Sequence, residues 1–472
     1  MRKADVKPLA LPLLLVLLTA CEVGPNYQRP QLEPTGQFRA QAQAEAASFA
    51  DQPWWDVFAD PTLKTLIGQA LANNFDAREA VQRVTEFRAR AGIERSDYLP
   101  QVDLGGQYQR GRNSDYAPNG GVTGNQISAQ GTLSWELDLW GRLRRLNEAS
   151  QAQYLASQDA QRGVFLATAA QVAQAYFQLR DLDARLEIAR STTQAFQETY
   201  DLFNRRFTGG AASALETARA EAAQATAAAY IPDLERQIQA QENLLCFLVG
   251  RNPGPIARGA ALTDQPLPPR IPAGLPSALL ERRPDLRQAE QELVTANAQV
   301  GVAQANYFPT LSLTGLLGGL APEVNQMYSR GKEWNFGPAL NLPPLQGLRL
   351  KYQKAAAVAQ WEQARTRYQA AVTGAFGEVA TLLTAYQKLA EVEVQQARSV
   401  AAYQEAVRLA TLRYTAGLSS YMEVLEAQQQ LFPAENSLAQ VRRSRLVSLV
   451  QLYKALGGGW NLKDPAWAGP NG

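Results

Sequence analysis

Histidine is absent from the 472-residue chain, and only two cysteines, Cys21 and Cys246, are present. A chain without histidine cannot form a Ser/His/Asp or Cys/His nucleophile system, a two-histidine zinc motif or an imidazole proton shuttle. The sequence also lacks a Walker-type phosphate loop and a GxGxxG fingerprint. We therefore expect a protein that is not an enzyme, with no catalytic residue and no metal site.

An excess of charge of one sign is also missing. The chain has 46 Lys and Arg residues against 44 Asp and Glu residues, a formal net charge of +2. Removal of residues 1–20 would take away three basic residues and one acidic residue and leave a charge of zero, which argues against a nucleic-acid partner. No long apolar run follows residue 20, so we expect no transmembrane helix in the mature chain.

The first twenty residues have the pattern of a processing signal. Basic residues precede an apolar run over residues 9–18, and Leu18-Thr19-Ala20-Cys21 follows. The run is too short to span a membrane. Its ending resembles a bacterial lipoprotein box, which implies cleavage before Cys21 and acylation of that thiol. An ordinary signal peptide with an incidental cysteine is the alternative. The only cofactor we expect is this covalent lipid, and Cys246, the one remaining cysteine, is expected to be a core residue.

The first half of the chain is repeated in the second half. Arg206-Phe207-Thr208-Gly209-Gly210 corresponds to Arg413-Tyr414-Thr415-Ala416-Gly417, and Tyr98-Leu99-Pro100 corresponds to Tyr307-Phe308-Pro309. Such self-similarity predicts two copies of one helix-and-strand unit in a pseudo-symmetric assembly. Chance similarity between Ala/Gln-rich helices is the alternative. The expected segments are a signal peptide (1–20), a first repeat with the mature N-terminus (21–250), a Pro/Gly-rich surface linker (251–283), a second repeat (284–456) and a tail (457–472).

Each repeat contains a predicted β-hairpin, at about 100–140 and about 309–343. Residues 126–139 alternate strictly between apolar and polar side chains, which indicates a strand with one apolar face. The second hairpin alternates less regularly, and Pro338 lies inside it although proline cannot donate to a ladder.

Strands of this kind are typical of outer-membrane barrels. Four strands cannot close a barrel, because the smallest spanning barrels have about eight. Open edges are not tolerated in lipid, so we expect closure by other copies of the chain. A soluble β-sandwich is the alternative.

The remainder of the sequence is helical in pattern. Residues 142 to about 207 and 348 to about 414 contain no proline, and each would form a helix roughly 100 Å long. The stretches 62–97 and 213–249 together have a similar length, as if two stacked helices lined one long helix. Asp60 as N-cap, followed by Pro61, predicts the start of the first helix. Helices of this length suit the wall of a tunnel.

Four blocks in order resemble one family, the TolC-like outer-membrane factors, in their efflux lipoprotein branch (NodT/OprM-type). These blocks are residues 21–27, 54–61, 276–286 and 455–460. The resemblance implies a mixed α/β membrane protein that forms a homotrimer, with one 12-stranded barrel in the outer membrane and a long periplasmic helical barrel. It also implies a periplasmic adaptor and an inner-membrane pump of the resistance-nodulation-division class as partners, with this chain as the passive exit duct.

The resemblance also assigns roles to the two helix-turn-helix tips, where Gly210 and Gly417 suit positive-φ helix stops. The residues expected to contact the adaptor are Gly209, Gly210, Ala211, Ala212, Gly417, Leu418 and Ser419. The residues expected to form the constriction and gate are Glu216, Tyr414, Met422, Glu423 and Glu426.

Within the gate, Tyr414 matches a family tyrosine and Glu216 its acidic partner. Glu423 and Glu426 are three residues apart and share a helix face, so a trimer would place six carboxylates near its axis. Two solvated surface glutamates are the alternative. Some family members carry an arginine where this chain has Ser419. The set of contacts that would hold the gate closed (the lock) is therefore either weaker in this chain or built from groups such as Arg413 or Arg219.

Three other functions compete with efflux. A TolC-like duct for type I protein secretion is the nearest, and a periplasmic adaptor lipoprotein would also have long hairpins and a lipid anchor. An adaptor would lack four amphipathic strands and would carry a compact β-rich domain. A surface lipoprotein without a transport role is the third.

Overall fold

The computed structural model describes residues 22–31, 38, 48–52, 57, 60–112, 114–116, 118, 120–265, 267–268, 271–274, 276–342 and 347–459. Cys21, the expected lipidation site, lies outside these residues. The longer helices are α3 (Pro61–Asn73), α4 (Phe75–Ser96), α5 (Arg142–Thr208), α6 (Ala214–Leu248), α8 (Pro284–Ala305), α9 (Gly347–Thr415) and α10 (Tyr421–Ala455). The strands are β1 (Gln101–Arg112), β2 (Thr123–Leu137), β3 (Thr310–Ala321) and β4 (Lys332–Asn341).

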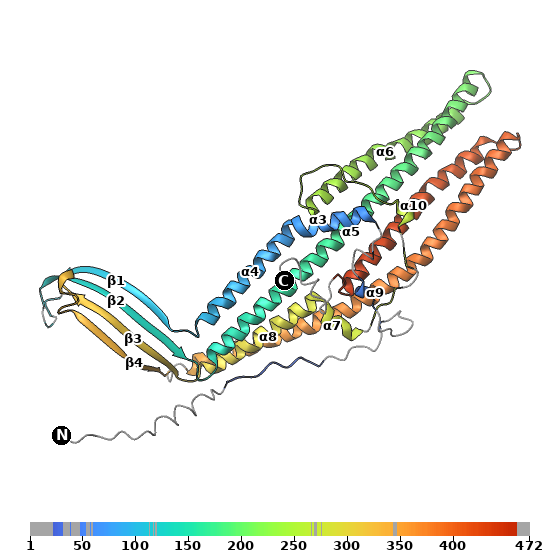
Figure 1. The fold of residues 1–472 in the computed structure, drawn as a ribbon. Coiled ribbons are helices and arrows are strands. Elements are labelled where there is room, and N and C mark those ends of the chain that lie inside the picture. Colours follow the sequence, from blue (N-terminus) through green and yellow to red (C-terminus); the bar gives the residue numbers. More distant parts are fainter. Residues whose placement is uncertain are drawn as a thin grey trace, which may run out of the picture. The chain divides into compact units, whose positions relative to one another are not determined.

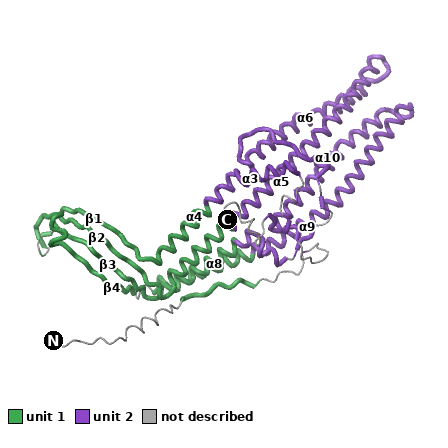
Figure 2. The backbone as a smooth tube through the Cα atoms, viewed as in Figure 1, with its two compact units in different colours: residues 1–31, 83–158, 288–369 green, residues 32–82, 159–287, 370–472 purple. Residues whose placement is uncertain are grey.

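The chain divides into two compact units, coloured separately in Figure 2. Unit 1 comprises residues 1–31, 83–158 and 288–369 and contains the strands. Unit 2 comprises residues 32–82, 159–287 and 370–472 and contains α3, α6, α10 and the short helix α7 (Leu279–Arg282).

The four strands of unit 1 form one antiparallel sheet in the order β1-β2-β3-β4 (Figure 1). The register places Leu104 opposite Gly131, Gly131 opposite Leu317, and Leu317 opposite Trp334. Because residues that pair across strands share a face, one face of the sheet is apolar from β1 to β4. The two predicted hairpins are therefore confirmed, and they join through β2 and β3.

The strand ends differ in detail from the prediction. β2 stops at Leu137, two residues before the expected end. Asp138 instead caps α5, because its carboxylate accepts hydrogen bonds from the N–H groups of Leu143 (3.1 Å) and Arg144 (3.0 Å). β4 continues through Pro338. In the single chain β4 is an edge strand with one unpaired side, so a proline removes no ladder hydrogen bond on that side there.

The long helices are unbroken, as predicted, with 67 residues in α5 and 69 in α9. The returning helices α6 and α10 have 35 residues each. No helix in the described part of the chain is both long and apolar enough to cross a bilayer.

The prediction of one helix over 62–97 is wrong, because Asn74 interrupts the helix and separates α3 from α4. The Asn74 amide nitrogen donates to the Leu248 carbonyl (2.9 Å), and its amide oxygen accepts from the Ala77 N–H (3.1 Å). Asn74 thus ends α3 and caps α4, with one side chain serving both helices. The predicted N-cap Asp60 is confirmed: its carboxylate accepts from the N–H groups of Thr62 and Leu63.

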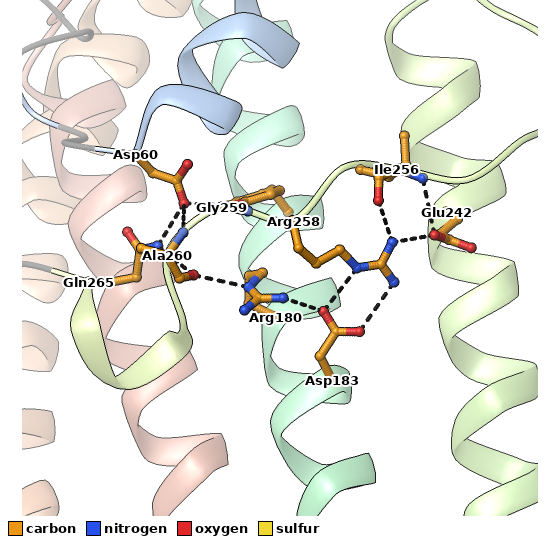
Figure 3. Close-up of polar contacts among 10 residues, drawn as sticks. Asp60, Arg180, Asp183, Glu242, Ile256, Arg258, Gly259, Ala260 and Gln265 are labelled. Atoms are coloured by element: carbon orange, nitrogen blue, oxygen red, sulfur yellow. Dashed lines mark hydrogen bonds and ion pairs between the residues drawn. The ribbon is translucent and has the colours of Figure 1, made fainter.

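Within the predicted linker 251–283, residues 256–265 are held to the neighbouring helices of unit 2 by a polar network (Figure 3). The Asp60 carboxylate accepts hydrogen bonds from the Tyr176 hydroxyl (2.8 Å), the Ala260 N–H (3.0 Å) and the Gln265 amide (2.9 Å). Burial disfavours the charged carboxylate, but the hydrogen bonds from Tyr176 and Gln265, with those from the N–H groups of Leu63 and Thr62, outweigh burial and lower the pKa of Asp60. The start of the linker is therefore a fixed part of the fold.

Arg258 holds the same segment through two acids. Its guanidinium contacts Asp183 on α5 (3.1 Å) and Glu242 on α6. Arg180 contacts Asp183 as well (2.6 Å) and donates to the Ala260 carbonyl (3.1 Å). Cys246 is fully buried nearby, and its thiol donates to the Gly254 carbonyl (3.2 Å), which confirms it as a core residue.

Candidate functional site: the two helical hairpin tips

The helical hairpins α5–α6 and α9–α10 end, within unit 2, in turns of the same geometry. Gly210 and Gly417 both have φ of +73°, which confirms the two predicted positive-φ helix stops. The N–H of Ala211 donates to the Arg206 carbonyl (2.7 Å), and the N–H of Leu418 donates to the Arg413 carbonyl (2.9 Å). Each glycine N–H also bonds a carbonyl three residues earlier. Both turns are therefore Schellman motifs, which satisfy the last carbonyls of the long helices.

The first turns of the returning helices differ. At α6, the Ser213 hydroxyl accepts from the Glu216 N–H (3.3 Å), and the Glu216 carboxylate accepts from the Ser213 N–H (2.9 Å). This is a complete capping box. At α10, Ser420 makes no side-chain cap hydrogen bond, and Glu423 instead forms an ion pair with Arg413 (3.4 Å).

An aromatic cluster joins the two hairpins near their tips. The Tyr414 ring lies 4.9 Å from the Tyr421 ring, which in turn lies 5.2 Å from the Phe203 ring, both edge to face. The Arg206 guanidinium lies 5.3 Å from the centre of the Tyr414 ring. The Tyr421 hydroxyl is also hydrogen-bonded to Thr199 on α5. Since these residues come from both hairpins, the cluster fixes one tip against the other.

Glu216 and Tyr414, the acid and the tyrosine expected to pair in the gate, do not bond each other within one chain. Glu216 is engaged by Ser213, and the buried Tyr414 hydroxyl has no hydrogen-bond partner among the described residues. The Ser419 hydroxyl is buried and unpaired in the same sense. Both alternative lock residues contact α10 instead: Arg413 pairs with Glu423, and Arg219 contacts the Met422 sulfur at 3.9 Å.

The remaining predicted residues lie at the start of α10 and in the two turns. Met422 packs against a small apolar cluster that includes Phe196 and Leu425. Glu423 and Glu426 are exposed at the start of α10. The predicted adaptor residues form the two exposed turns, with Ala212 and Ser419 partly covered.

Sequence reasoning missed three residues of the cluster: Arg206, Phe203 and Tyr421. Arg206 was visible as the repeat counterpart of Arg413, but nothing in the repeat shows that it reaches the other hairpin. Among the described residues, no group of three or more His, Cys, Asp or Glu side chains is arranged to hold a metal ion. The tips therefore combine two fixed turns, the aromatic cluster of Phe203, Tyr414 and Tyr421 with Arg206 (the clasp), and the exposed carboxylates of α10.

Comparisons with known proteins agree with this architecture. The outer membrane efflux protein family matches residues 66–251 and 275–458, one match for each repeat. The toluene efflux pump outer membrane protein TtgC of Pseudomonas putida is 35% identical, with 96% of this chain and 95% of that protein covered. The cation efflux system protein CusC of Escherichia coli is 32% identical, with 95% and 98% covered.

A solved structure is also similar over nearly the whole chain. The open state of the MtrE outer membrane channel of Neisseria gonorrhoeae has a TM-score of 0.84 and 32% identity, with 93% of this chain and 98% of that chain covered. The family matches span most of the sequence and follow the two repeats seen in the fold. The chain belongs to the outer membrane efflux protein family.

Proposed function

We propose that three copies of this chain form the exit duct of a tripartite efflux system of the resistance-nodulation-division type. The protein lies in the outer membrane and extends into the periplasm, as the members of its family do. In this proposal the duct is passive and carries out no catalysis, and a periplasmic adaptor and an inner-membrane pump deliver the cargo and supply the energy.

The observation that carries the proposal is a four-stranded sheet with an apolar face and two open edges. β1 and β4 are its outer strands, and every residue of β1 is exposed in the single chain. Unpaired strand edges cannot be left in hydrocarbon. Pairing β1 of one copy with β4 of the next would close a barrel of twelve strands, within the range of known spanning barrels.

The proposed cargo is small molecules or ions. The names of the relatives TtgC and CusC refer to toluene and cation efflux, which favours this cargo over a secreted protein. A periplasmic adaptor is disfavoured because the chain contains the four-stranded amphipathic sheet that an adaptor lacks.

We assign the periplasmic mouth to the two tips. The exposed turns at 209–212 and 417–419 would contact the adaptor. Glu216, Tyr414 and Met422 would shape the closed mouth, and Glu423 with Glu426 would form an acidic ring in the trimer. An acyl group on Cys21 would anchor the mature N-terminus, and the duct would need no other cofactor.

The test is single-channel recording of the purified, lipidated protein in a planar bilayer, with its oligomer size measured in parallel. Discrete cation-selective openings from a trimer are the expected result. A monomer that washes off membranes and forms no channels would contradict the proposal and favour an adaptor or surface lipoprotein. Since a shut mouth conducts little, a silent trimer is tested again with Tyr414→Ala, which should open it; continued silence would contradict the duct.

The acidic ring has its own test. The double variant Glu423→Gln with Glu426→Gln should lower the preference for cations over anions, because it removes six carboxylates from the trimer. Glu391→Gln is the matched control, since Glu391 is an exposed glutamate of α9 that pairs with Lys388 (2.8 Å) away from the tip. Unchanged selectivity in the double variant would place Glu423 and Glu426 off the pore.

A further inference from the structure

The apolar face of the sheet carries a groove that nothing in the described part of the chain fills. Its volume is about 970 Å³. Gly131 and Gly315 line it from the two middle strands, in adjacent rows of the sheet. Its walls are large apolar side chains from the strands on either side, among them Leu104, Trp334 and Phe336.

The two glycines make room for the side chains of Leu104 and Phe336, which lie over them and line the groove. A Cβ atom at Gly131 would lie 3.2 Å from a methyl group of Leu104, and one at Gly315 would lie 3.2 Å from the Phe336 ring. The walls are exposed in the single chain, with Leu104 87% and Trp334 72% accessible. Because these apolar side chains are exposed and line one groove, another apolar group can bury surface against them.

A positively charged side chain, that of Lys332, lines the groove. Lys332 pairs in register with Gly319, on the same sheet face as Trp334, and it lines the groove beside Tyr328. It is exposed, and it has no ion-pair partner among the described residues. Lys332 is the first residue of β4 and follows the β3–β4 loop, whereas α9 follows the other end of this strand. Since the helices of the family extend into the periplasm, the Lys332 end faces the outer leaflet.

We propose that this groove binds an acyl chain of a phosphorylated glycolipid of the outer leaflet, the lipid A class, with a lipid phosphate at Lys332. The inference rests on the proposed function, because it requires the apolar face to be turned to the bilayer. The groove offers an acyl chain an apolar lining, and the lysine supplies the charge that a phosphate needs. Another copy of the chain is not the occupant, because copies pair through the β1 and β4 edges and leave this face free.

The experiment uses native mass spectrometry of the lipidated trimer in zwitterionic detergent, with lipid A or phosphatidylglycerol added at matched concentrations. Lipid A should be retained in preference to phosphatidylglycerol. Lys332→Gln should weaken its retention about fivefold, the effect of one lysine near a charged lipid surface. The matched control is Lys351→Gln, an exposed lysine of α9 outside the sheet.

A second variant tests the groove itself. Gly315→Leu displaces the Phe336 ring and occupies part of the groove, so it should reduce lipid A retention about tenfold, because burial of about two methylene groups is lost. The control is Gly337→Leu: Gly337 pairs with Thr314 on the polar face, and a Cβ atom added there would have no neighbour within 4 Å. Should Gly315→Leu fail to assemble, Lys332→Gln alone decides the result.

Three results would overturn the inference: no lipid retained above the detergent background, retention that ignores both substitutions, or preference for phosphatidylglycerol. Single-channel recording of the same preparations separates this failure from failure of the duct. If trimers conduct but hold no lipid A, only the groove assignment is wrong.

Discussion

The two hairpin tips share one backbone geometry but differ in their charge contacts. Both helices stop at a glycine with φ of +73°, and the residue after each glycine donates to an arginine carbonyl. In the first tip, the glutamate at the start of the returning helix closes a capping box. In the second tip, the N-cap residue Ser420 makes no side-chain cap hydrogen bond, and the corresponding Glu423 pairs with Arg413.

The difference shows that the two copies of the repeat use the same position for different contacts. The turn must be kept in both copies because each long helix needs its last carbonyls satisfied. The acidic side chain is not bound by that requirement. In the first repeat it stabilises the helix start, and in the second it stays exposed and pairs with Arg413. The aromatic position has diverged too: Tyr414 joins the clasp, while its counterpart Phe207 is 46% exposed.

The largest expected effect comes from removing the clasp. Tyr414→Ala deletes the edge-to-face contact with Tyr421 and the Arg206 guanidinium contact, together worth roughly 2 kcal/mol per chain. If the clasp holds the mouth shut, the open probability in single-channel recordings should rise about tenfold or more. Phe207→Ala, the same truncation in the other repeat, should leave gating nearly unchanged.

Equal gating effects of the two truncations would contradict this assignment. Tyr414→Phe is a second control, because it keeps the ring contacts and removes only a hydroxyl that has no hydrogen-bond partner among the described residues. It should behave like the unmodified protein. A large effect of Tyr414→Phe would show that the hydroxyl finds a partner in a neighbouring copy.

Much of this fold could be predicted from the sequence because its signals are local. Strict alternation over 126–139 indicated a strand, and the tip glycines indicated the helix stops. The break at Asn74 was missed because its cause is a hydrogen bond to Leu248, distant in the sequence. The Arg206–Tyr414 contact was missed for the same reason, since it depends on how the hairpins pack. The expected Glu216–Tyr414 pairing is not made within one chain, where Glu216 bonds Ser213, and between copies it stays a prediction.

A smaller effect tests the geometry that the tips share. Gly210→Ala and Gly417→Ala should each destabilise their tip by about 1–2 kcal/mol, because an alanine is strained at positive φ. Neither glycine has an atom within 4 Å of an added Cβ, so the two costs should be equal. Hydrogen exchange of the tip amides would measure them. Gly209→Ala is the control, since the second repeat already has Ala416 there, and unequal costs at Gly210 and Gly417 would show that the tips differ in more than charge.

The smallest effect distinguishes the two glutamates by pH. Hydrogen bonds from the Ser213 backbone and hydroxyl lower the pKa of Glu216 in the folded protein. A lowered pKa means that the stabilisation is present above the unfolded pKa and is lost as pH falls through the folded pKa. Glu216→Gln should therefore reduce protection of the α6 amides at neutral pH, and the difference from the unmodified protein should vanish in acid. Glu423→Gln should leave the protection of the first turn of α10 unchanged at neutral pH, because Glu423 does not cap that helix; equal losses in both helices would contradict the division of roles between the tips.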